Sequence, residues 1–314
     1  MISNMKLSTI SPIRFFFSTF RCLDVSTFRV QSIIDNRQST ILLALTLVTL
    51  LATAALGTDL RLPVDVRAEL ARANADFEDA QRIQTEDPQR ARALYRSAAQ
   101  RFESLISAGI ESGPLEYNLG NCYLQAGDLG RAILHYRRAQ RYMPNDPLLA
   151  DNFREARSRR MTAIPPSRSS EFLKSVFFWH EQTTTSARTK AALALYAAFW
   201  LLITIRCWFA RRWLMVTAVI CGLLAAAAGA SVAVDDWRDR NAPSGVLIAM
   251  DVPVYKGPGS GYQRQFEQPL QPGTEFTLRE RRGQWWNIEL PDGQTGWIES
   301  AAVELVVRPN EGDR

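Results

Sequence analysis

GPLEYNLGNCYLQAGDLGRAILHYRRAQRYMP, residues 113–144, contains two stretches of helical apolar spacing with a turn between them. The turn is marked by Gly127-Asp128, a dipeptide that favours a reversal of the chain. Gly120 and Ala132 are small enough to let two helices approach closely, and Pro144 ends the second helix because proline has no amide hydrogen. The stretch therefore predicts two antiparallel helices.

This pattern resembles the tetratricopeptide repeat. The signature of that family is matched at Leu119, Gly120, Tyr123, Ala132, Tyr136, Ala139 and Pro144. One position departs from the pattern, because Glu116 stands where the family usually has tryptophan. The resemblance implies an all-α solenoid, which we assign to residues 58–160, with the best repeat at 113–146.

A second apolar stripe lies upstream of this repeat, at Ala91, Tyr95, Ala98, Phe102 and Leu105. Its spacing predicts one face of a helix that begins after Pro88 and ends at Gly109. We interpret this helix as half of a degenerate repeat, with residues 67–84 as its first helix and 146–160 as a capping helix. Because about three repeats are usually needed for a stable stack, we expect a partner or the membrane to support it.

In tetratricopeptide repeats, ligands usually lie along the concave face formed by the first helices. Residues that would project onto this face are Tyr117, Asn121, Leu124 and Gln125. We take them as a candidate protein-binding groove. The alternative is that they are ordinary surface residues, since the basic residues that clamp a peptide carboxylate are absent from these positions.

Three long apolar runs occupy residues 41–57, 191–209 and 213–234. The last has no charged residue and is long enough to cross roughly 30 Å of hydrocarbon. The second is interrupted only by Arg206, near its end. Core helices of a soluble protein are the alternative, but such helices usually keep a polar face. We therefore expect transmembrane helices.

The positively charged residues beside these runs indicate how the runs are oriented in the membrane. The basic tail at residues 1–40 precedes the first run, and Arg206, Arg211 and Arg212 lie around the turn between the other two. The positive-inside rule places tail and turn in the cytoplasm. We expect a multi-pass protein of the bacterial inner membrane whose other domains are extracytoplasmic. The run at 41–57 is either a cleaved signal peptide or an uncleaved signal anchor.

Residues 241–308 change to short alternating runs separated by turns, which predict about five strands. Trp286, Ile288 and Leu290 are expected to face one side of a sheet. The segment resembles a bacterial SH3 domain through its GPG, PGT, G-x-W and PDG-x-x-GW elements. The resemblance implies a small all-β barrel.

A candidate groove of this barrel consists of Tyr255, Tyr262, Trp285 and Trp297, for a peptide or a cell-wall fragment. The alternative is that these aromatic side chains fill the core of the barrel. Polyproline binding is not expected, because Glu299 and Ala302 stand where SH3 domains that bind polyproline have a proline and a tyrosine.

No nucleophile elbow, P-loop, HExxH or dinucleotide fingerprint is present, so we expect no enzyme activity and no cofactor. The linker at 161–190 contains EFLKSVFFWH, an aromatic stretch that we expect at the membrane surface. His180 within it lacks further ligands, so no metal site is expected. Cys122 is predicted to pack in the repeat, and His135 to lie on the surface.

The predicted fold class is a multidomain membrane protein with a tetratricopeptide-repeat solenoid, transmembrane helices and a C-terminal SH3-like barrel. This order of parts resembles the BatE-type proteins of bacterial aerotolerance operons. The resemblance implies a scaffold in envelope-stress tolerance, working with von Willebrand A-domain membrane proteins and a MoxR-type ATPase. Two alternatives are a peptidoglycan-recognition or sensor protein and an assembly factor for another membrane complex. Nucleic acid is not expected as a partner, because the arginines behind the net charge of +5 follow membrane topology.

Overall fold

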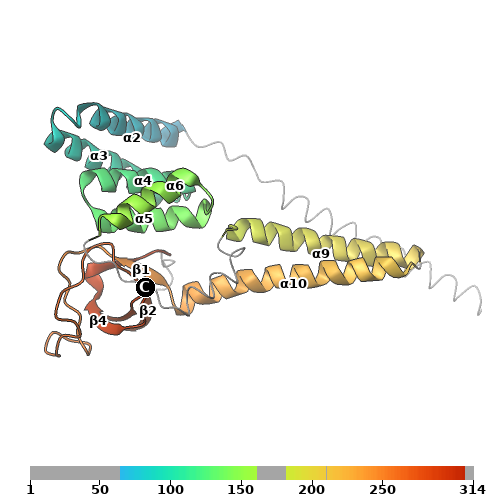
Figure 1. The fold of residues 1–314 in the computed structure, drawn as a ribbon. Coiled ribbons are helices and arrows are strands. Elements are labelled where there is room, and N and C mark those ends of the chain that lie inside the picture. The colour runs from blue at the N-terminus through green and yellow to red at the C-terminus, as the bar shows by residue number, and fades with distance from the viewer. Residues whose placement is uncertain (1–63, 161–181, 210, 308–314) are drawn as a thin grey trace, which may run out of the picture. The chain divides into compact units, whose positions relative to one another are not determined.

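The computed structural model describes residues 64–209, except 161–181, and residues 211–307 (Figure 1). The basic tail, the first apolar run at 41–57 and the aromatic stretch at 171–180 lie outside the described residues. The chain divides into two compact units, and the described parts of the smaller unit are residues 192–209 and 211–226. The larger unit contains the N-terminal helices and the C-terminal sheet.

The helical region, residues 64–160, contains the helices α2 (Val64–Ile83), α3 (Pro88–Ser107), α4 (Gly113–Ala126), α5 (Leu129–Tyr142) and α6 (Pro147–Ser158). Their ends follow from local chemistry. Asp87, Asp128 and Asp146 each accept a hydrogen bond from a backbone amide in the first turn of the helix that follows. Gly127 ends α4 with a φ of 88°, a left-handed conformation that glycine adopts without strain.

The core of the helical region confirms the predicted apolar stripe, since Ala91, Tyr95, Ala98, Phe102 and Leu105 are all buried. The close approach of α4 and α5 also follows the prediction. A Cβ atom on Gly120 would lie 2.6 Å from the Tyr136 ring, so this glycine makes room for the tyrosine. Cys122 is fully buried beside them, as predicted.

The β-domain, residues 244–307, is a five-stranded antiparallel sheet in the order β4-β3-β2-β1-β5. Its strands are β1 (Ser244–Leu247), β2 (Glu275–Arg282), β3 (Trp285–Glu289), β4 (Thr295–Glu299) and β5 (Val303–Leu305). The tight turns at Gly283 and Gly293 have φ values of 57° and 91°, which favour glycine. The predicted alternation in β3 is confirmed, because Ile288 and Leu290 are buried and Trp286 packs against the same core.

Two helices, α9 (Thr185–Trp208) and α10 (Arg212–Asn241), are long and apolar enough to cross a membrane. Within the smaller unit, Gly222 of α10 lies against the ring of Phe199, where a Cβ atom would be 3.2 Å away. In the larger unit, the last turns of α10 carry Asp239, which forms a two-bond ion pair with Arg141 of α5 at 2.6 and 3.1 Å.

Helix α5 packs directly on the β-domain within the larger unit. Val246 and Val306 belong to the same buried apolar cluster as Ile133. The closest contact is at Gly130, where a Cβ atom would lie 2.8 Å from both the Leu247 carbonyl oxygen and the Ile248 Cα. Only a residue without a side chain allows the two backbones to come this close.

Arg138 adds a polar anchor to this contact. Its side chain is almost fully buried and donates hydrogen bonds to the carbonyl oxygens of Leu305 at 2.7 Å and Val306 at 3.1 Å. It also forms an ion pair with Glu304 at 2.8 Å. A buried guanidinium is tolerated only when its donors are satisfied, so β5 stabilises this residue of α5.

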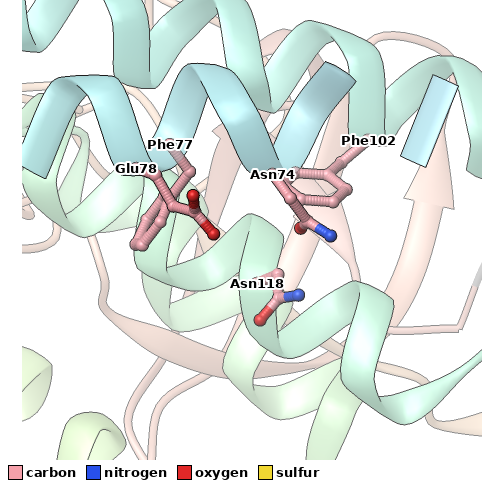
Figure 2. A pocket seen from close by; sticks show the side chains of 5 residues that line it. All are labelled: Asn74, Phe77, Glu78, Phe102 and Asn118. Atoms are coloured by element: carbon pink, nitrogen blue, oxygen red, sulfur yellow. The ribbon is translucent and has the colours of Figure 1, made fainter. Parts of the chain in front are cut away.

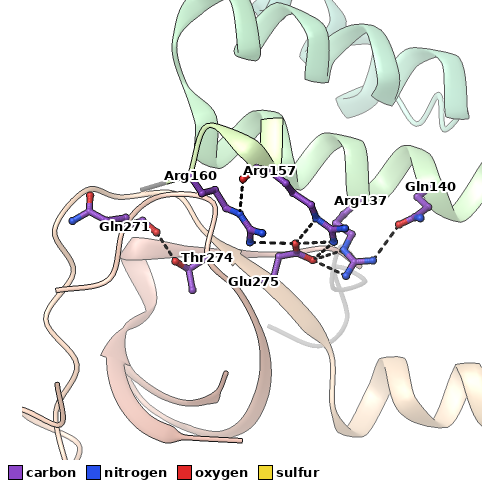
Figure 3. Close-up of polar contacts among 7 residues, drawn as sticks. All are labelled: Arg137, Gln140, Arg157, Arg160, Gln271, Thr274 and Glu275. Carbon is purple, nitrogen blue, oxygen red and sulfur yellow. Dashed lines mark hydrogen bonds and ion pairs between the residues drawn. The ribbon is translucent and has the colours of Figure 1, made fainter. Parts of the chain in front are cut away.

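A second cluster lies beside the first, where Glu275 of β2 receives three arginines of the helical region (Figure 3). Arg137 lies 2.5 Å from the carboxylate, Arg157 lies 2.8 Å away and Arg160 lies 3.7 Å away. Burial alone would raise the pKa of the Glu275 carboxyl, but the charges of Arg137 and Arg157 outweigh it and hold the pKa below its usual value.

We expect Gly130→Ala to destabilise the protein by about 1–2 kcal/mol, because the added methyl group overpacks the contact with Ile248. In an ordinary helix the same change stabilises by about 0.5–1 kcal/mol, so the sign tests the contact. Thermal unfolding of the detergent-solubilised full chain measures it. Gly261→Ala is the control, since nothing lies within 4 Å of that position. A stabilised Gly130→Ala variant would show that α5 and the β-domain are not packed in solution.

Candidate functional site

A pocket opens between α2 and α4, and α3 also contributes to its lining (Figure 2). Its residues are Asn74, Phe77 and Glu78 of α2, Phe102 of α3 and Asn118 of α4. Phe102 is 1% exposed and forms the floor, while the half-buried Phe77 is fixed by an edge-to-face contact with Tyr95 at 5.3 Å. The pocket therefore combines an apolar floor with a polar rim.

The rim of the pocket has unused hydrogen-bonding capacity. Among the described residues, the side chains of Asn74, Glu78 and Asn118 form no hydrogen bond or ion pair with the rest of the protein. Glu78 is exposed on the surface of α2, and Figure 2 shows its carboxylate on the same side as both amides. This arrangement can accept and donate hydrogen bonds to a ligand.

Three other carboxylates of α2 are already paired with arginines. Glu69 and Asp76 both bind Arg101, each at 2.8 Å, and Asp79 forms an ion pair with an arginine one turn later at 3.1 Å. Glu78 therefore differs from its neighbours on the same helix, because its charge has no partner among the described residues.

The predicted groove residues lie on the same helix, α4, but two of them are used inside the protein. The Asn121 Oδ1 atom accepts hydrogen bonds from the Tyr136 hydroxyl at 2.7 Å and from the Asn152 amide at 3.0 Å. The same amide lies 2.8 Å from the Tyr117 hydroxyl, to which it donates. Tyr117 and Asn121 thus join α4 to α5 and α6.

Of the other two predicted groove residues, Leu124 is buried in the core rather than projecting outward. Gln125 receives a hydrogen bond of 3.3 Å from Gln84, which directly follows α2. Sequence reasoning missed the pocket beside them because α2 does not match the repeat signature. The one sequence signal for this pocket is Asn118, which directly follows the predicted groove residue Tyr117.

The prediction that His135 lies on the surface is wrong, since the residue is 3% exposed. Its Nδ1 atom lies 2.7 Å from the carboxylate of Glu116, which is equally buried. The ring of Tyr123 stacks on the imidazole at 5.4 Å, and the Tyr123 hydroxyl donates to Glu103. Glu116, at the position where the resembled family has tryptophan, therefore requires a buried polar partner.

Burial lowers the pKa of His135, and the hydrogen bond with Glu116 opposes this only in part. Arg138 on the same helix also lowers this pKa, whereas Glu304 of β5 raises it. Burial raises the pKa of the Cys122 thiol to about 12, so the thiolate that would act as a nucleophile is not formed near neutral pH. Within the described residues no group of three or more His, Cys, Asp or Glu could hold a metal ion.

The aromatic residues predicted to line a groove of the β-domain are only partly brought together. Tyr255 and Trp285 form an edge-to-face pair at 5.5 Å, and both are half-buried. Trp297 is joined to Tyr255 by two backbone hydrogen bonds but is 7% exposed, with Arg282 over its ring. Tyr262 is exposed and its ring lies on Gly257. The pair Tyr255 and Trp285 is therefore the candidate contact surface of this domain.

Residues 249–304 match the family of the bacterial SH3 domain. The match covers most of the β-domain, including β2, β3 and β4. No curated protein and no solved structure gives a significant match to the chain.

Acid is expected to destabilise the helical region through His135. Because burial lowers its pKa, the unfolded chain, with a histidine pKa near its usual 6.5, binds the proton more readily than the folded chain. The free energy of unfolding should fall below pH 6.5, by at most about 1.4 kcal/mol per pH unit. The lowered pKa of Glu275 affects stability only near and below its usual value of 4.5, so the range from pH 7.5 to 5.5 avoids the contribution of this carboxyl.

Denaturant unfolding of the full chain across this pH range measures the effect. His135→Gln should remove the slope, and His180→Gln, which changes the other histidine of the chain, should leave it unchanged. A slope that survives in His135→Gln would contradict the assignment.

Proposed function

We propose that the chain is a membrane-anchored, non-enzymatic scaffold that binds other proteins. In this proposal the helical region is a tetratricopeptide-repeat module and the β-domain is its SH3-like companion. The signature residues of 113–144 and the antiparallel packing of α4 on α5 support the repeat assignment. The family match at 249–304 supports the second module, because bacterial SH3 domains suit binding of proteins or of peptidoglycan.

The observation that carries this proposal is the distribution of free surface on the helical region. The β-domain packs on α5 and occupies that side. The pocket between α2 and α4 stays open, and its polar rim has no partner among the described residues. A concave surface bordered by hydrogen-bonding groups that the protein does not use can receive part of a ligand.

The membrane part of the proposal rests on α9 and α10, with the arginine-containing turn between them. We propose that both helices span the inner membrane as a hairpin with this turn in the cytoplasm. The apolar run of α10 ends at Val234 and β1 begins at Ser244, so only a short polar stretch, mostly the last turns of α10, would separate the β-domain from the membrane. Helical region and β-domain would then both be extracytoplasmic.

The order of modules resembles BatE-type proteins, and it leads us to propose a role in envelope-stress or aerotolerance complexes. By this resemblance the partners would be von Willebrand A-domain membrane proteins and an associated MoxR-type ATPase. Recognition of peptidoglycan is a second candidate, favoured by the family match and by the edge-to-face pair of Tyr255 and Trp285. Aromatic pairs of this kind can stack against a sugar or a peptide.

Site-specific crosslinking in cells tests the scaffold. A photoreactive phenylalanine analogue at Asn118, in the pocket, should form adducts with a partner protein that mass spectrometry can identify. The same analogue at Arg92, an exposed residue of α3, should form none. Equal adducts at both positions, or none at either, would refute a binding role for this pocket. Retention of the purified chain on peptidoglycan that is lost in Trp285→Ala would favour the second candidate instead.

Reporter fusions test the topology. Alkaline phosphatase, which is active only outside the cytoplasm, should be active after Arg160 and after Arg314, and a cytoplasm-active reporter should function at Ala210. The expectation follows from the arginines that flank the turn. Inactive phosphatase at either outer position would overturn the arrangement.

A further inference from the structure

The pocket between α2 and α4 is the size of a single side chain. Its volume is about 120 Å³. Sites for cofactors and other small molecules usually measure roughly 300–1,000 Å³. The occupant is therefore best sought among the side chains of a bound peptide.

The chemistry of the pocket selects among the side chains. An acidic side chain would meet the carboxylate of Glu78, and no lysine or arginine lines the pocket to offset the repulsion. A purely apolar side chain would pack on Phe102 but would shield Glu78 from water without giving it a partner, which costs free energy. Neither an acidic nor an apolar side chain therefore suits both the aromatic floor and the polar rim of the pocket.

A long basic side chain matches both parts. The methylene groups of lysine or arginine pack on aromatic rings while the charged end remains polar, and a cation is also attracted to the ring face. Here the stem would lie on Phe77 and Phe102, and the charged end would reach the Glu78 carboxylate. The side-chain oxygens of Asn74 and Asn118 can accept its remaining hydrogen bonds.

We propose that this pocket binds a lysine or arginine side chain of an extended peptide segment in a partner protein. The inference rests on the proposed function, because it names the partner chemistry for the same site. It also fits the charge pattern of α2. Glu69, Asp76 and Asp79 are paired internally, so Glu78 is the carboxylate of the pocket that is available to a basic ligand.

The test uses the full chain in lipid nanodiscs and five pools of fluorescent octapeptides with blocked ends. The central residue is Lys, Arg, Gln, Leu or Glu, and the other positions are random mixtures of Gly, Ala, Ser and Asn. Fluorescence polarisation at low salt should show the Lys and Arg pools binding about fivefold more tightly than the Gln pool, as expected for one partly exposed ion pair. The preference should weaken as salt is added.

Two substitutions in α2 test whether Glu78 causes the preference for basic peptides. Glu78→Gln keeps the shape of the side chain and should abolish the preference for basic pools. Asp79→Asn removes a neighbouring charge that is paired with Arg82 and should leave the preference intact. Both positions are on the surface, so the fold is expected to tolerate either change.

The outcomes separate this inference from the proposed function. Tightest binding of the Leu or Glu pool, or a basic preference that persists in Glu78→Gln, would overturn the inference and leave peptide binding standing. Failure of every pool to bind would overturn the inference, while crosslinked adducts at Asn118 would still support the proposed function. If Asp79→Asn loses the preference for basic peptides to the same extent, the preference arises from the general charge of α2. That result would also overturn the inference that the pocket binds a basic side chain.

Discussion

Arg138 is the residue on which the relation between the helical region and the β-domain depends. Its guanidinium is buried, and its hydrogen bonds to the protein run to Glu304 and to the carbonyl oxygens of Leu305 and Val306. Without β5 these donors would face an apolar contact, and a buried charge left without a partner costs about 3–5 kcal/mol. The helical region therefore depends on the β-domain for part of its stability.

This dependence explains how so short a helical stack is completed. Helix α5 forms one side of this short stack. If the apolar residues on that side were exposed to water, the stack would be less stable. Val246 and Val306 extend the buried cluster of the helices across that side, and Gly130 lets the two backbones meet. The support that the sequence led us to expect from a partner or the membrane is supplied, on this side, by the chain's own sheet. The sheet does not cover the pocket between α2 and α4.

Features that depend on neighbours in sequence could be predicted, and features that depend on distant residues could not. The stripe on α3, the turn at Gly127 and the alternation in β3 follow from spacing and local chemistry. The pairing of Glu275 with Arg137 joins residues 138 positions apart, and no periodic pattern in the sequence indicates it. His135 was placed on the surface for the same reason, since its burial is intelligible only once Glu116 is seen to face it.

The charges of the larger unit lead to one further conclusion about binding. The formal net charge of +5 could suggest a surface for nucleic acid, yet Arg101, Arg138 and Arg157 are all engaged with carboxylates of the protein. Each of these three arginines joins one element to another, because its planar group can bind two acceptors at once. A charge that borders a pocket is more informative about a ligand than the net charge. Glu78, at the rim of an aromatic pocket, is such a charge, and it directs the search for a partner towards basic rather than acidic segments.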